Sequence, residues 1–454
     1  MGRIFVALMF VFALVGWACQ IERVKPPNVL IITLDTTRAD YISTYGSARA
    51  ATPSIDRLAA DGVVFEQAVS VAPLTLPAHT SLFTGLLPFR HGVRDNAAAP
   101  LGADHETLAE ILRRRGYQTA AFVSSAILKA DRGLASGFDT YDDHSGSSRT
   151  ASGGLQRPAD ETVNAAIRWL DRRADKPFFL WVHLNDPHAP YDPPEPFRTA
   201  YRDDPYAGEV AFADEQIGRL TDFLNGRWLL DRTAVIITAD HGESLQEHGE
   251  AGHGIFLYQS VVHVPLIIRA PVLRARRVPE VVRLVDVMPT ILELTHTDRP
   301  AAGVDGISLI DLARGRGDLD RDAYSESLYP LRFGWSPLHS LRNGRFKLIA
   351  APRPELYDLE RDPEELHNLF SARSALGLAM ARRLAEIEPA ASGNDRGAGS
   401  SPPSEIVERL GALGYITRTP TMAKPTRGPL PDPKDRIGEY NALARRRSEA
   451  QGRK

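Results

Sequence analysis

Two short apolar runs, far apart in the sequence, end in the same way. The first run, residues 28–34, is followed by Asp35, and the second, residues 233–239, is followed by Asp240 and His241. Apolar runs of this length predict strands that are buried on both faces of a mainly parallel sheet. Because ligand sites in open α/β sheets lie beyond the carboxyl ends of the strands, we expect Asp35, Asp240 and His241 to meet at one edge of such a sheet.

A third segment, residues 73–85, reads Pro-Leu-Thr-Leu-Pro-Ala-His-Thr-Ser-Leu-Phe-Thr-Gly. It predicts a helix that begins at Thr75, accommodates Pro77 in its first turn and ends at Gly85. A helix N-terminus carries free backbone N–H groups and the positive end of the helix dipole, so an anionic ester can dock there beside the Thr75 hydroxyl. The alternative is that Thr75 only caps a buried helix.

These side chains together predict a metal site with a nucleophile beside it. Two carboxylates (Asp35 and Asp240), one imidazole (His241) and one hydroxyl (Thr75) form a suitable ligand set for a divalent ion. Three oxygen ligands and one nitrogen ligand favour Mn²⁺ or Zn²⁺, with Ca²⁺ as the alternative. Metal coordination lowers the pKa of a hydroxyl that is otherwise unreactive at neutral pH.

Longer motifs surround these residues and follow one another in a fixed order. They are residues 28–40 (NVLIITLDTTRAD), 52–59 (TPSIDRLA), 75–85 (TLPAHTSLFTG), 88–96 (PFRHGVRDN), 183–191 (HLNDPHAPY) and 238–243 (TADHGE). With them the chain resembles, over residues 28–370, the sulfatase branch of the alkaline phosphatase superfamily. The resemblance implies an α/β fold, a three-layer αβα sandwich with a small C-terminal antiparallel sheet subdomain.

The sequence departs from the family pattern at three positions. Thr75 stands where sulfatases have the Cys or Ser that is oxidised to formylglycine, His79 stands where they have an Arg, and Thr36 replaces a second aspartate. Threonine cannot give that aldehyde, whereas relatives that cleave phosphate esters use a Thr nucleophile. We therefore expect a metal-dependent hydrolase of phosphate mono- or diesters. The alternatives are a sulfuric ester hydrolase, a transferase of phospho groups to envelope glycans or lipids, and an inactive anion-binding protein.

Three further histidines are candidate catalytic residues. His188 and His253 occupy positions that resemble the family's contacts to the substrate anion and the leaving group. A second interpretation makes Asp186, His188 and His253 the ligands of a second metal ion, and we favour a single metal. His79 lies one helical turn after Thr75, where it either contacts the bound anion or forms an interior hydrogen bond to the backbone. The substrate itself is expected to be an anionic ester of a glycan, a lipid or a small molecule.

Composition excludes several other classes of protein. The formal net charge is −3, from 54 Lys and Arg against 57 Asp and Glu. Nucleic-acid binders carry a concentrated basic excess, so no nucleic-acid partner is expected. A single cysteine, Cys19, excludes an internal disulfide framework and a zinc site built from cysteines.

The ends of the chain differ from its body. Residues 1–27 start with Arg3, continue with the apolar run 4–17 and contain Cys19, which together resemble either a lipoprotein-type leader or a signal anchor. We therefore expect an exported protein in the periplasm or outer envelope, with membrane attachment through a lipid or the signal anchor.

The remaining boundaries follow from shifts in composition. The catalytic domain spans residues 28–322, with a polar surface loop at 145–156 near the site mouth, and a C-terminal α+β subdomain spans 323–388. Within this subdomain, Asn343-Gly344 predicts a hairpin turn, and residues 364–387 predict a helix. Residues 389–454 are predicted to be a flexible, Pro-rich tail, whose end (436–454) is either a basic helix or disordered.

Overall fold

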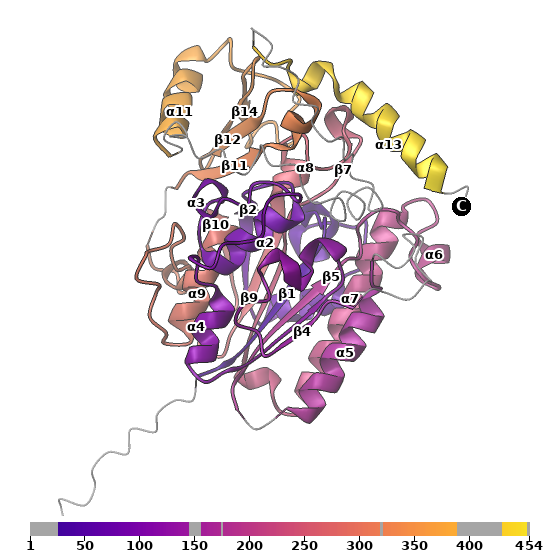
Figure 1. The fold of residues 1–454 in the computed structure, drawn as a ribbon, viewed down its shortest axis with the longest axis vertical. Helices are drawn as coiled ribbons and strands as arrows, with labels where there is room; N and C mark the ends of the chain where they lie inside the picture. The colour runs from indigo at the N-terminus through magenta and orange to yellow at the C-terminus, as the bar shows by residue number, and fades with distance from the viewer. Residues whose placement is uncertain (1–25, 145–155, 174–175, 318–320, 388–428, 452–454) are drawn as a thin grey trace, which may run out of the picture.

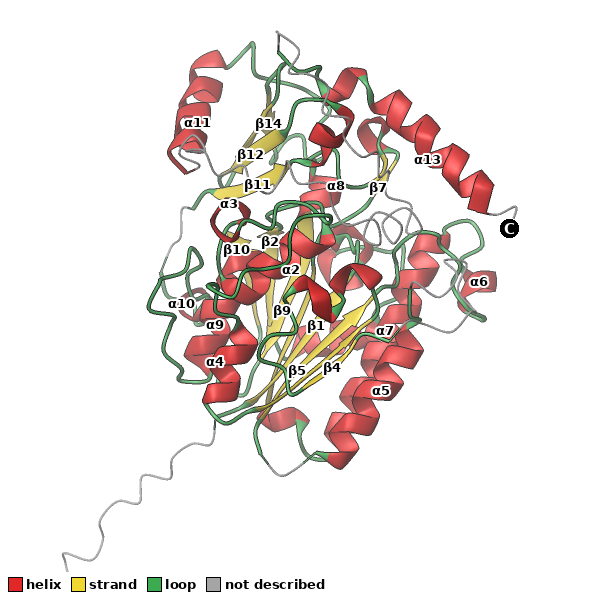
Figure 2. Ribbon diagram, in the orientation of Figure 1, coloured by secondary structure: helices red, strands yellow, loops and turns green. Residues whose placement is uncertain are grey.

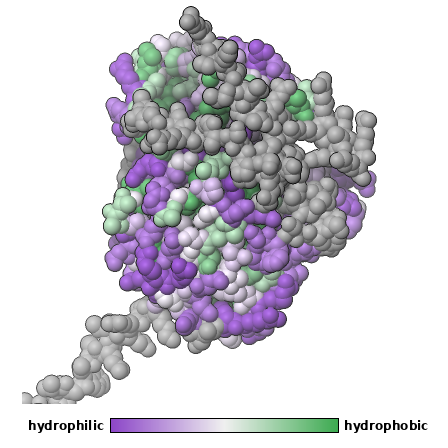
Figure 3. All heavy atoms as spheres, viewed as in Figure 1, coloured by the Kyte–Doolittle hydropathy of each residue, from purple (hydrophilic) through white to green (hydrophobic). Residues whose placement is uncertain are grey.

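A computed structural model describes residues 26–144, 156–173, 176–317, 321–387 and 429–451. The expected leader up to residue 25 and nearly all of the surface loop expected at 145–156 lie outside the described residues. Among the helices that are described, none combines the length and the apolar character that crossing a membrane requires. On the described part of the face in Figure 3, hydrophilic residues predominate and apolar residues are scattered, as is usual for a protein surface.

The core of the molecule is a mixed sheet of eight strands in the order β10-β2-β9-β6-β1-β5-β3-β4 (Figure 1). The strands are β1 (Asn28–Leu34), β2 (Val63–Val69), β3 (Gln118–Val123), β4 (Thr140–Asp142), β5 (Phe178–Leu184), β6 (Thr233–Ala239), β9 (His263–Arg269) and β10 (Arg276–Arg283). The central strand β1 pairs in parallel with β5 on one side and with β6 on the other. The two apolar runs recognised in the sequence are therefore neighbours in the middle of the sheet.

Helices cover both faces of the sheet and make the predicted three layers (Figure 2). The helices of this part are α1 (Pro53–Ala60), α2 (Thr75–Thr84), α3 (Pro88–His91), α4 (Leu108–Arg114), α5 (Ala159–Arg172), α6 (Phe197–Ala200), α7 (Pro205–Gly226), α8 (Gln259–Val262), α9 (Val287–Leu294) and α10 (Ile310–Ala313). Side chains of β1 alternate between the faces: Val29 and Ile31 belong to the cluster under α2, α4 and α9, whereas Leu30 and Ile32 belong to the cluster under α1, α5 and α7. Both faces of β1 are buried, which explains its continuous apolar sequence.

The C-terminal subdomain is an antiparallel sheet of four strands with one helix, as expected. Its elements are β11 (Ala323–Ser327), β12 (Leu338–Arg342), β13 (Phe346–Ala350), β14 (Glu355–Asp358) and α11 (Ser374–Ile387). The turn between β12 and β13 is fixed by the Asn343 side chain, which accepts hydrogen bonds from the backbone N–H groups of Arg345 (3.0 Å) and Phe346 (2.7 Å).

The helix predicted at residues 364–387 begins ten residues later than expected. Glu365 has a positive φ of 58°, and its buried carboxylate pairs with Lys347 at 2.8 Å. Asp362 accepts hydrogen bonds from the backbone N–H groups of Leu366 (3.0 Å) and His367 (2.8 Å). These contacts hold the segment before Ser374 in turns rather than in a helix.

The final stretch contains an ordered helix. Residues 389–428 lie outside the described part of the chain, but residues 437–451 form α13 (Ile437–Gln451), one of the two predicted alternatives. Tyr440 is 6% exposed, and its ring contacts the rings of Tyr329 and Phe333 at centroid distances of 6.3 and 5.8 Å. The tail expected to be flexible therefore ends in a helix that packs on the folded body.

The buried His91 makes stability depend on pH. Its Nδ1 accepts a hydrogen bond from the Val93 N–H at 3.1 Å, so its Nε2–H donates to the Ser81 hydroxyl at 2.9 Å. This arrangement suits only the neutral ring, and burial, followed by the charges of His105 and Arg94, lowers the pKa of His91 to about 3. The unfolded chain, with a histidine pKa of about 6.5, binds the proton first. Stability is therefore lost as pH falls below that value.

We expect His91 to contribute a loss of about 2 kcal/mol in the free energy of unfolding between pH 7 and pH 5. Urea unfolding at the two pH values measures this loss, and His91→Gln should remove it because glutamine does not titrate. The matched control is His367→Gln, at a side chain that is 79% exposed. An unchanged pH dependence in His91→Gln would show that His91 does not carry the effect.

Candidate active site

The register of the central strands brings the predicted ligands together. Leu34, the last residue of β1, lies opposite Ala239 of β6 and Leu184 of β5. The next residue on β1 is Asp35 and the next on β6 is Asp240, so the two carboxylates leave adjacent parallel strands at the same level. This is the sheet edge at which the sequence predicted a site.

Asp35, Asp240 and His241 offer ligand atoms that all lie within 4.8 Å of one another, and all three side chains are at most 1% exposed. One oxygen of Asp240, Oδ1, accepts hydrogen bonds from the backbone N–H groups of His241 (2.9 Å) and Thr36 (3.3 Å). Its other oxygen and both oxygens of Asp35 have no hydrogen-bond partner. His241 Nδ1–H donates to the Gly242 carbonyl at 2.9 Å, which leaves Nε2 to face the carboxylates.

This arrangement fits a divalent cation. His241 Nε2 lies 3.4 Å from Asp240 Oδ2 and 3.8 Å from Asp35 Oδ1, separations suited to atoms that share one ion. Burial, and then the negative charge of Asp35, raise the pKa of Asp240 well above its ordinary value. Burial acts on Asp35 in the same direction, but the neighbouring histidines outweigh it and hold that pKa below its ordinary value. Buried carboxylate oxygens without partners are costly, and a bound cation would remove that cost.

Thr75 is the first residue of α2 and is 1% exposed. Its hydroxyl oxygen lies 3.5 Å from His241 Nε2. The helix cap is the preceding Leu74, and no side-chain capping bond is formed. The hydroxyl of Thr75 is thus directed at the carboxylate and imidazole cluster rather than used to cap the helix.

His79 lies one turn after Thr75 on α2 and is hydrogen bonded to other buried groups. Its Nδ1–H donates to the Thr75 carbonyl at 2.8 Å, and its Nε2 accepts from the Thr33 hydroxyl at 3.1 Å. Burial, followed by the charge of His183, lowers the pKa of His79 to about 3. This is the interior hydrogen-bonded arrangement that the sequence left open, and it makes His79 a support for the first turn of α2.

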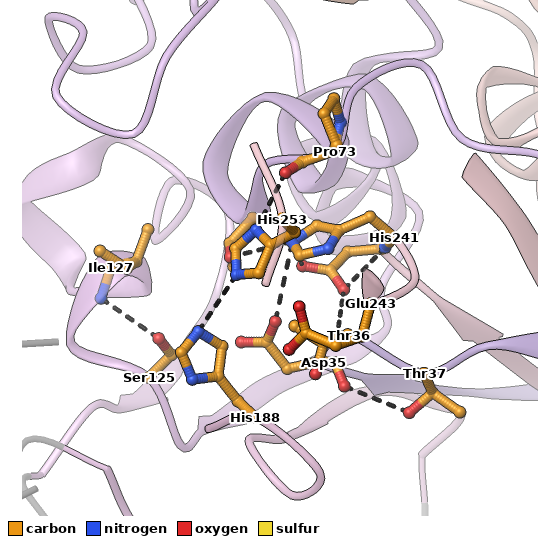
Figure 4. A network of polar contacts seen from close by, with 12 residues as sticks. Asp35, Thr36, Thr37, Pro73, Ser125, Ile127, His188, His241, Glu243 and His253 are labelled. Carbon is orange, nitrogen blue, oxygen red and sulfur yellow. Dashed lines mark hydrogen bonds and ion pairs between the residues drawn. The ribbon is translucent and has the colours of Figure 1, made fainter. Parts of the chain in front are cut away.

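His253 lies next to His241, and His188 lies beyond His253 (Figure 4). Their Nε2 atoms are 3.4 Å apart, and the rings of His253 and His241 have a centroid distance of 4.3 Å. The Nδ1–H of His253 donates to the Pro73 carbonyl at 3.1 Å, and the Nδ1 of His188 lies 2.7 Å from the Ala189 carbonyl oxygen and 3.0 Å from the Gln156 side-chain nitrogen. The two imidazoles therefore face the site with their Nε2 atoms.

The second metal site considered in the sequence analysis is not formed by the described residues. Asp186 turns away from the histidines: its Oδ2 accepts from the Ala159 N–H at 2.9 Å, at the start of α5. The group of ligand atoms found in the described part of the chain is that of Asp35, Asp240 and His241.

Sequence reasoning missed the role of two buried neighbours. His183, in register with Thr33 across β5 and β1, places its Nε2 3.5 Å from Asp35 Oδ2. A polar residue inside an apolar strand was the available signal. Thr36 has a positive φ of 49°, which is rare for a β-branched residue, and its hydroxyl is buried without a partner.

The comparisons with known proteins agree with this geometry. Residues 27–297 match the family model described as Sulfatase, and residues 247–388 match the model described as N-sulphoglucosamine sulphohydrolase, C-terminal. The uncharacterized sulfatase YidJ of Escherichia coli (strain K12) is 26% identical in an alignment that covers 76% of this chain and 83% of the relative. The N-acetylglucosamine-6-O-sulfatase of Bacteroides thetaiotaomicron is 24% identical in an alignment that covers 77% of this chain and 84% of that enzyme.

A solved structure shows the same fold. The phosphonate monoester hydrolase of Agrobacterium radiobacter superposes with a TM-score of 0.69 at 24% identity, over 80% of this chain and 95% of the hydrolase. The predicted sulfatase-like sandwich is thereby confirmed. The Sulfatase model spans more than half of the chain and includes Asp35, Thr75, Asp240 and His241. The chain therefore belongs to the sulfatase family of hydrolases, in the alkaline phosphatase superfamily.

Proposed function

We propose that this protein is a metal-dependent hydrolase of phosphate esters that uses Thr75 as its nucleophile. The observation that carries the proposal is the position of the Thr75 hydroxyl. It lies at the N-terminus of α2, 3.5 Å from His241 Nε2 and beside the unpartnered oxygens of Asp35 and Asp240. A helix N-terminus favours the binding of an anionic ester, so nucleophile and substrate charge meet at one point.

The identity of the nucleophile supports phosphate over sulfate. The carbon that bears the threonine hydroxyl also bears a methyl group, so oxidation to formylglycine is closed at residue 75. Without an aldehyde hydrate, the enzyme has to release its product by hydrolysis of a threonine ester. A phosphoryl-threonine can be cleaved by in-line attack of water, whereas we expect a sulfated threonine to persist.

The residues of this chain divide the reaction between them. The Thr75 hydroxyl gives up its proton, and its oxygen attacks phosphorus to form a phosphoryl-threonine while the bond from phosphorus to the leaving oxygen breaks. The proton from Thr75 replaces the one that the histidines give to the leaving oxygen. A proton between the facing Nε2 atoms of His188 and His253, which are 3.4 Å apart, is placed to go to that oxygen, since the Nδ1 atoms of both rings contact other groups. Burial, and then the charges of His241 and His188, lower the pKa of His253, which favours release of the proton. Water then cleaves the phosphoryl-threonine and regenerates the hydroxyl.

A divalent ion, Mn²⁺ or Zn²⁺ by the donor set, would be held by Asp35, Asp240, His241 and the Thr75 oxygen. Such an ion lowers the pKa of a bound hydroxyl and withdraws charge from the ester. Hydrogen bonds to the backbone orient these ligands. The N–H groups of Thr36 and His241 donate to Asp240, and His241 donates to the Gly242 carbonyl.

The second candidate function, hydrolysis of sulfate esters, comes from the names of related proteins. One solved neighbour is a phosphonate monoester hydrolase, and one relative is an N-acetylglucosamine-6-O-sulfatase. A sulfated glycan is therefore the alternative substrate class, and an anionic ester is common to both.

A side-by-side rate comparison tests the proposal. We expect the protein with Mn²⁺ or Zn²⁺ to hydrolyse an aryl phosphate mono- or diester with multiple turnovers, and to release at most one equivalent of phenol from an aryl sulfate. EDTA should abolish both reactions. Multiple-turnover hydrolysis of the aryl sulfate at the phosphoester rate would contradict the argument from Thr75 and favour the second candidate.

A further inference from the structure

The segment that carries His253 contains two glycines with unusual backbone angles. Gly252 and Gly254 flank His253, and both have φ values, +110° and +107°, that other residues rarely adopt. Glycine at these positions permits the turn but leaves the unsupported chain with many accessible conformations. The chain beside His253 is held by hydrogen bonds from the backbone N–H groups of Ile255 (2.8 Å) and Phe256 (3.2 Å) to the Glu250 carboxylate, and any further contact to the hairpin narrows its conformations more.

The hairpin before His253 gives little support by itself. It consists of β7 (Ser244–Leu245) and β8 (Ala251–Gly252), which form two residue pairs. An isolated hairpin of this size is not stable in water. This hairpin connects His241 on the metal side of the site to His253 on the leaving-group side.

The helix α13 lies beside this hairpin (Figure 1) and is hydrogen bonded to it. The side-chain amide of Asn441 donates from Nδ2 to the Gly249 carbonyl at 2.6 Å, and its Oδ1 accepts from the Ala251 N–H at 3.2 Å. The side chain thus binds the outward-facing groups of two alternate residues, as a neighbouring strand would. Ile437, one turn earlier, packs at Gly249, where a Cβ would lie 3.5 Å from its Cγ2 atom.

A second contact leads from α13 to the far side of His253. Tyr440 packs edge-on against Tyr329 at a centroid distance of 6.3 Å, with an interplanar angle of 87°. Tyr329 in turn lies against Gly254, where a Cβ would be 3.1 Å from its Cδ1 atom. The helix therefore reaches the chain on both sides of His253.

We propose that α13 is a clamp that positions His253, and that Asn441 is its positioning residue. The two hydrogen bonds from Asn441 hold residues 249–251. They thereby restrict the backbone of the glycines on either side of His253 and keep its ring between His188 and His241. The inference rests on the proposed catalytic role of His253, but the contacts of Asn441 with the hairpin do not depend on that role.

The variant Asn441→Ala isolates the bridge. Alanine is a better helix former than asparagine, so the substitution removes both hydrogen bonds without weakening α13. We expect kcat/KM for an aryl phosphate to fall about 10- to 100-fold, because small displacements of a catalytic group have effects of that size. Metal content should be unchanged. Arg445→Ala, at an exposed position of the same helix, is the matched control and should leave kcat/KM and metal content unchanged.

A double-mutant cycle separates positioning from general damage. If Asn441 acts through His253, Asn441→Ala should have no further effect on rate in a His253→Ala background. An equal additional loss in that background would overturn the proposal.

Amide hydrogen exchange supplies a readout that does not depend on turnover. We expect residues 244–254 to exchange faster in Asn441→Ala than in the wild type or in Arg445→Ala. If the wild type hydrolyses no ester while exchange is accelerated, the proposed function fails and the clamp stands. Unaltered exchange, or accelerated exchange with a wild-type rate of hydrolysis, would overturn the clamp as a positioning device.

Discussion

Replacing Thr75 by alanine is expected to lower kcat for phosphoester hydrolysis by a factor on the order of 10⁴ or more, as for other removed nucleophiles. In the proposed mechanism the hydroxyl is the attacking group. The start of the helix keeps its hydrogen bonds, from the Ala78 N–H to the Leu74 carbonyl and from the Leu76 N–H to the Asn96 side-chain oxygen. The fold should therefore survive. Rates at saturating metal concentration measure the effect, because Thr75 is also a proposed ligand.

Two further variants define what the Thr75 result means. Thr75→Ser keeps the nucleophile and should retain activity about tenfold below the wild type, since one missing methyl group typically changes binding by about 1–3 kcal/mol. Thr80→Ala removes another buried hydroxyl of α2, which donates to the Leu76 carbonyl at 2.7 Å, and should leave the chemistry intact. Thr75→Ala activity equal to that of Thr80→Ala would exclude Thr75 as the nucleophile.

The second large effect is expected at the metal site. Asp240→Asn should lower the affinity for Mn²⁺ or Zn²⁺ by more than about 100-fold, since even residues that only support a ligand contribute roughly 10- to 100-fold. In the wild type, saturation at about 100 times Kd adds about 2.7 kcal/mol to the free energy of unfolding. The amide introduced by this substitution is a neutral ligand beside Asp35, so the metal-dependent gain should disappear.

Metal analysis of purified protein and thermal unfolding with and without added metal measure the two parts of this prediction. Asp186→Asn is the matched control, because Asp186 accepts a hydrogen bond from the Ala159 N–H at the start of α5 and the side-chain oxygen of an asparagine can accept the same bond. It should keep the metal-dependent gain in stability. Loss of the gain in Asp186→Asn would revive the two-metal interpretation, and full metal content in Asp240→Asn would show that the ligands are assigned incorrectly.

The local sequence was sufficient to predict the two central strands and the position of the carboxylates that follow them. The strands before Asp35 and Asp240 are buried on both faces, so their continuous apolar character identified them and placed both carboxylates at one edge. The same reasoning does not predict the position of His183 beside Asp35. That position follows from the register between β5 and β1, which depends on packing between distant parts of the chain.

The C-terminal helix shows a different limit. The Pro-rich and Gly-rich composition before it indicated a flexible tail, and residues 437–451 have weak amphipathic character. The contacts of Asn441 with residues 249 and 251 span about 190 positions in the chain. Contacts of this range depend on the finished fold, so a local pattern does not reveal them.

The neighbouring position of β1 and β6 also constrains how the nascent protein matures. Asn28 and Thr233, whose side chains are hydrogen bonded at 3.4 Å where the two strands begin, are 205 residues apart. The loop between them must close before Asp35 meets Asp240, and closing so long a loop is slow. A ribosome-bound chain shorter than residue 241 has no complete cation-binding site. A cation that binds this site can therefore do so only after residue 241 has been synthesised and β1 has paired with β6.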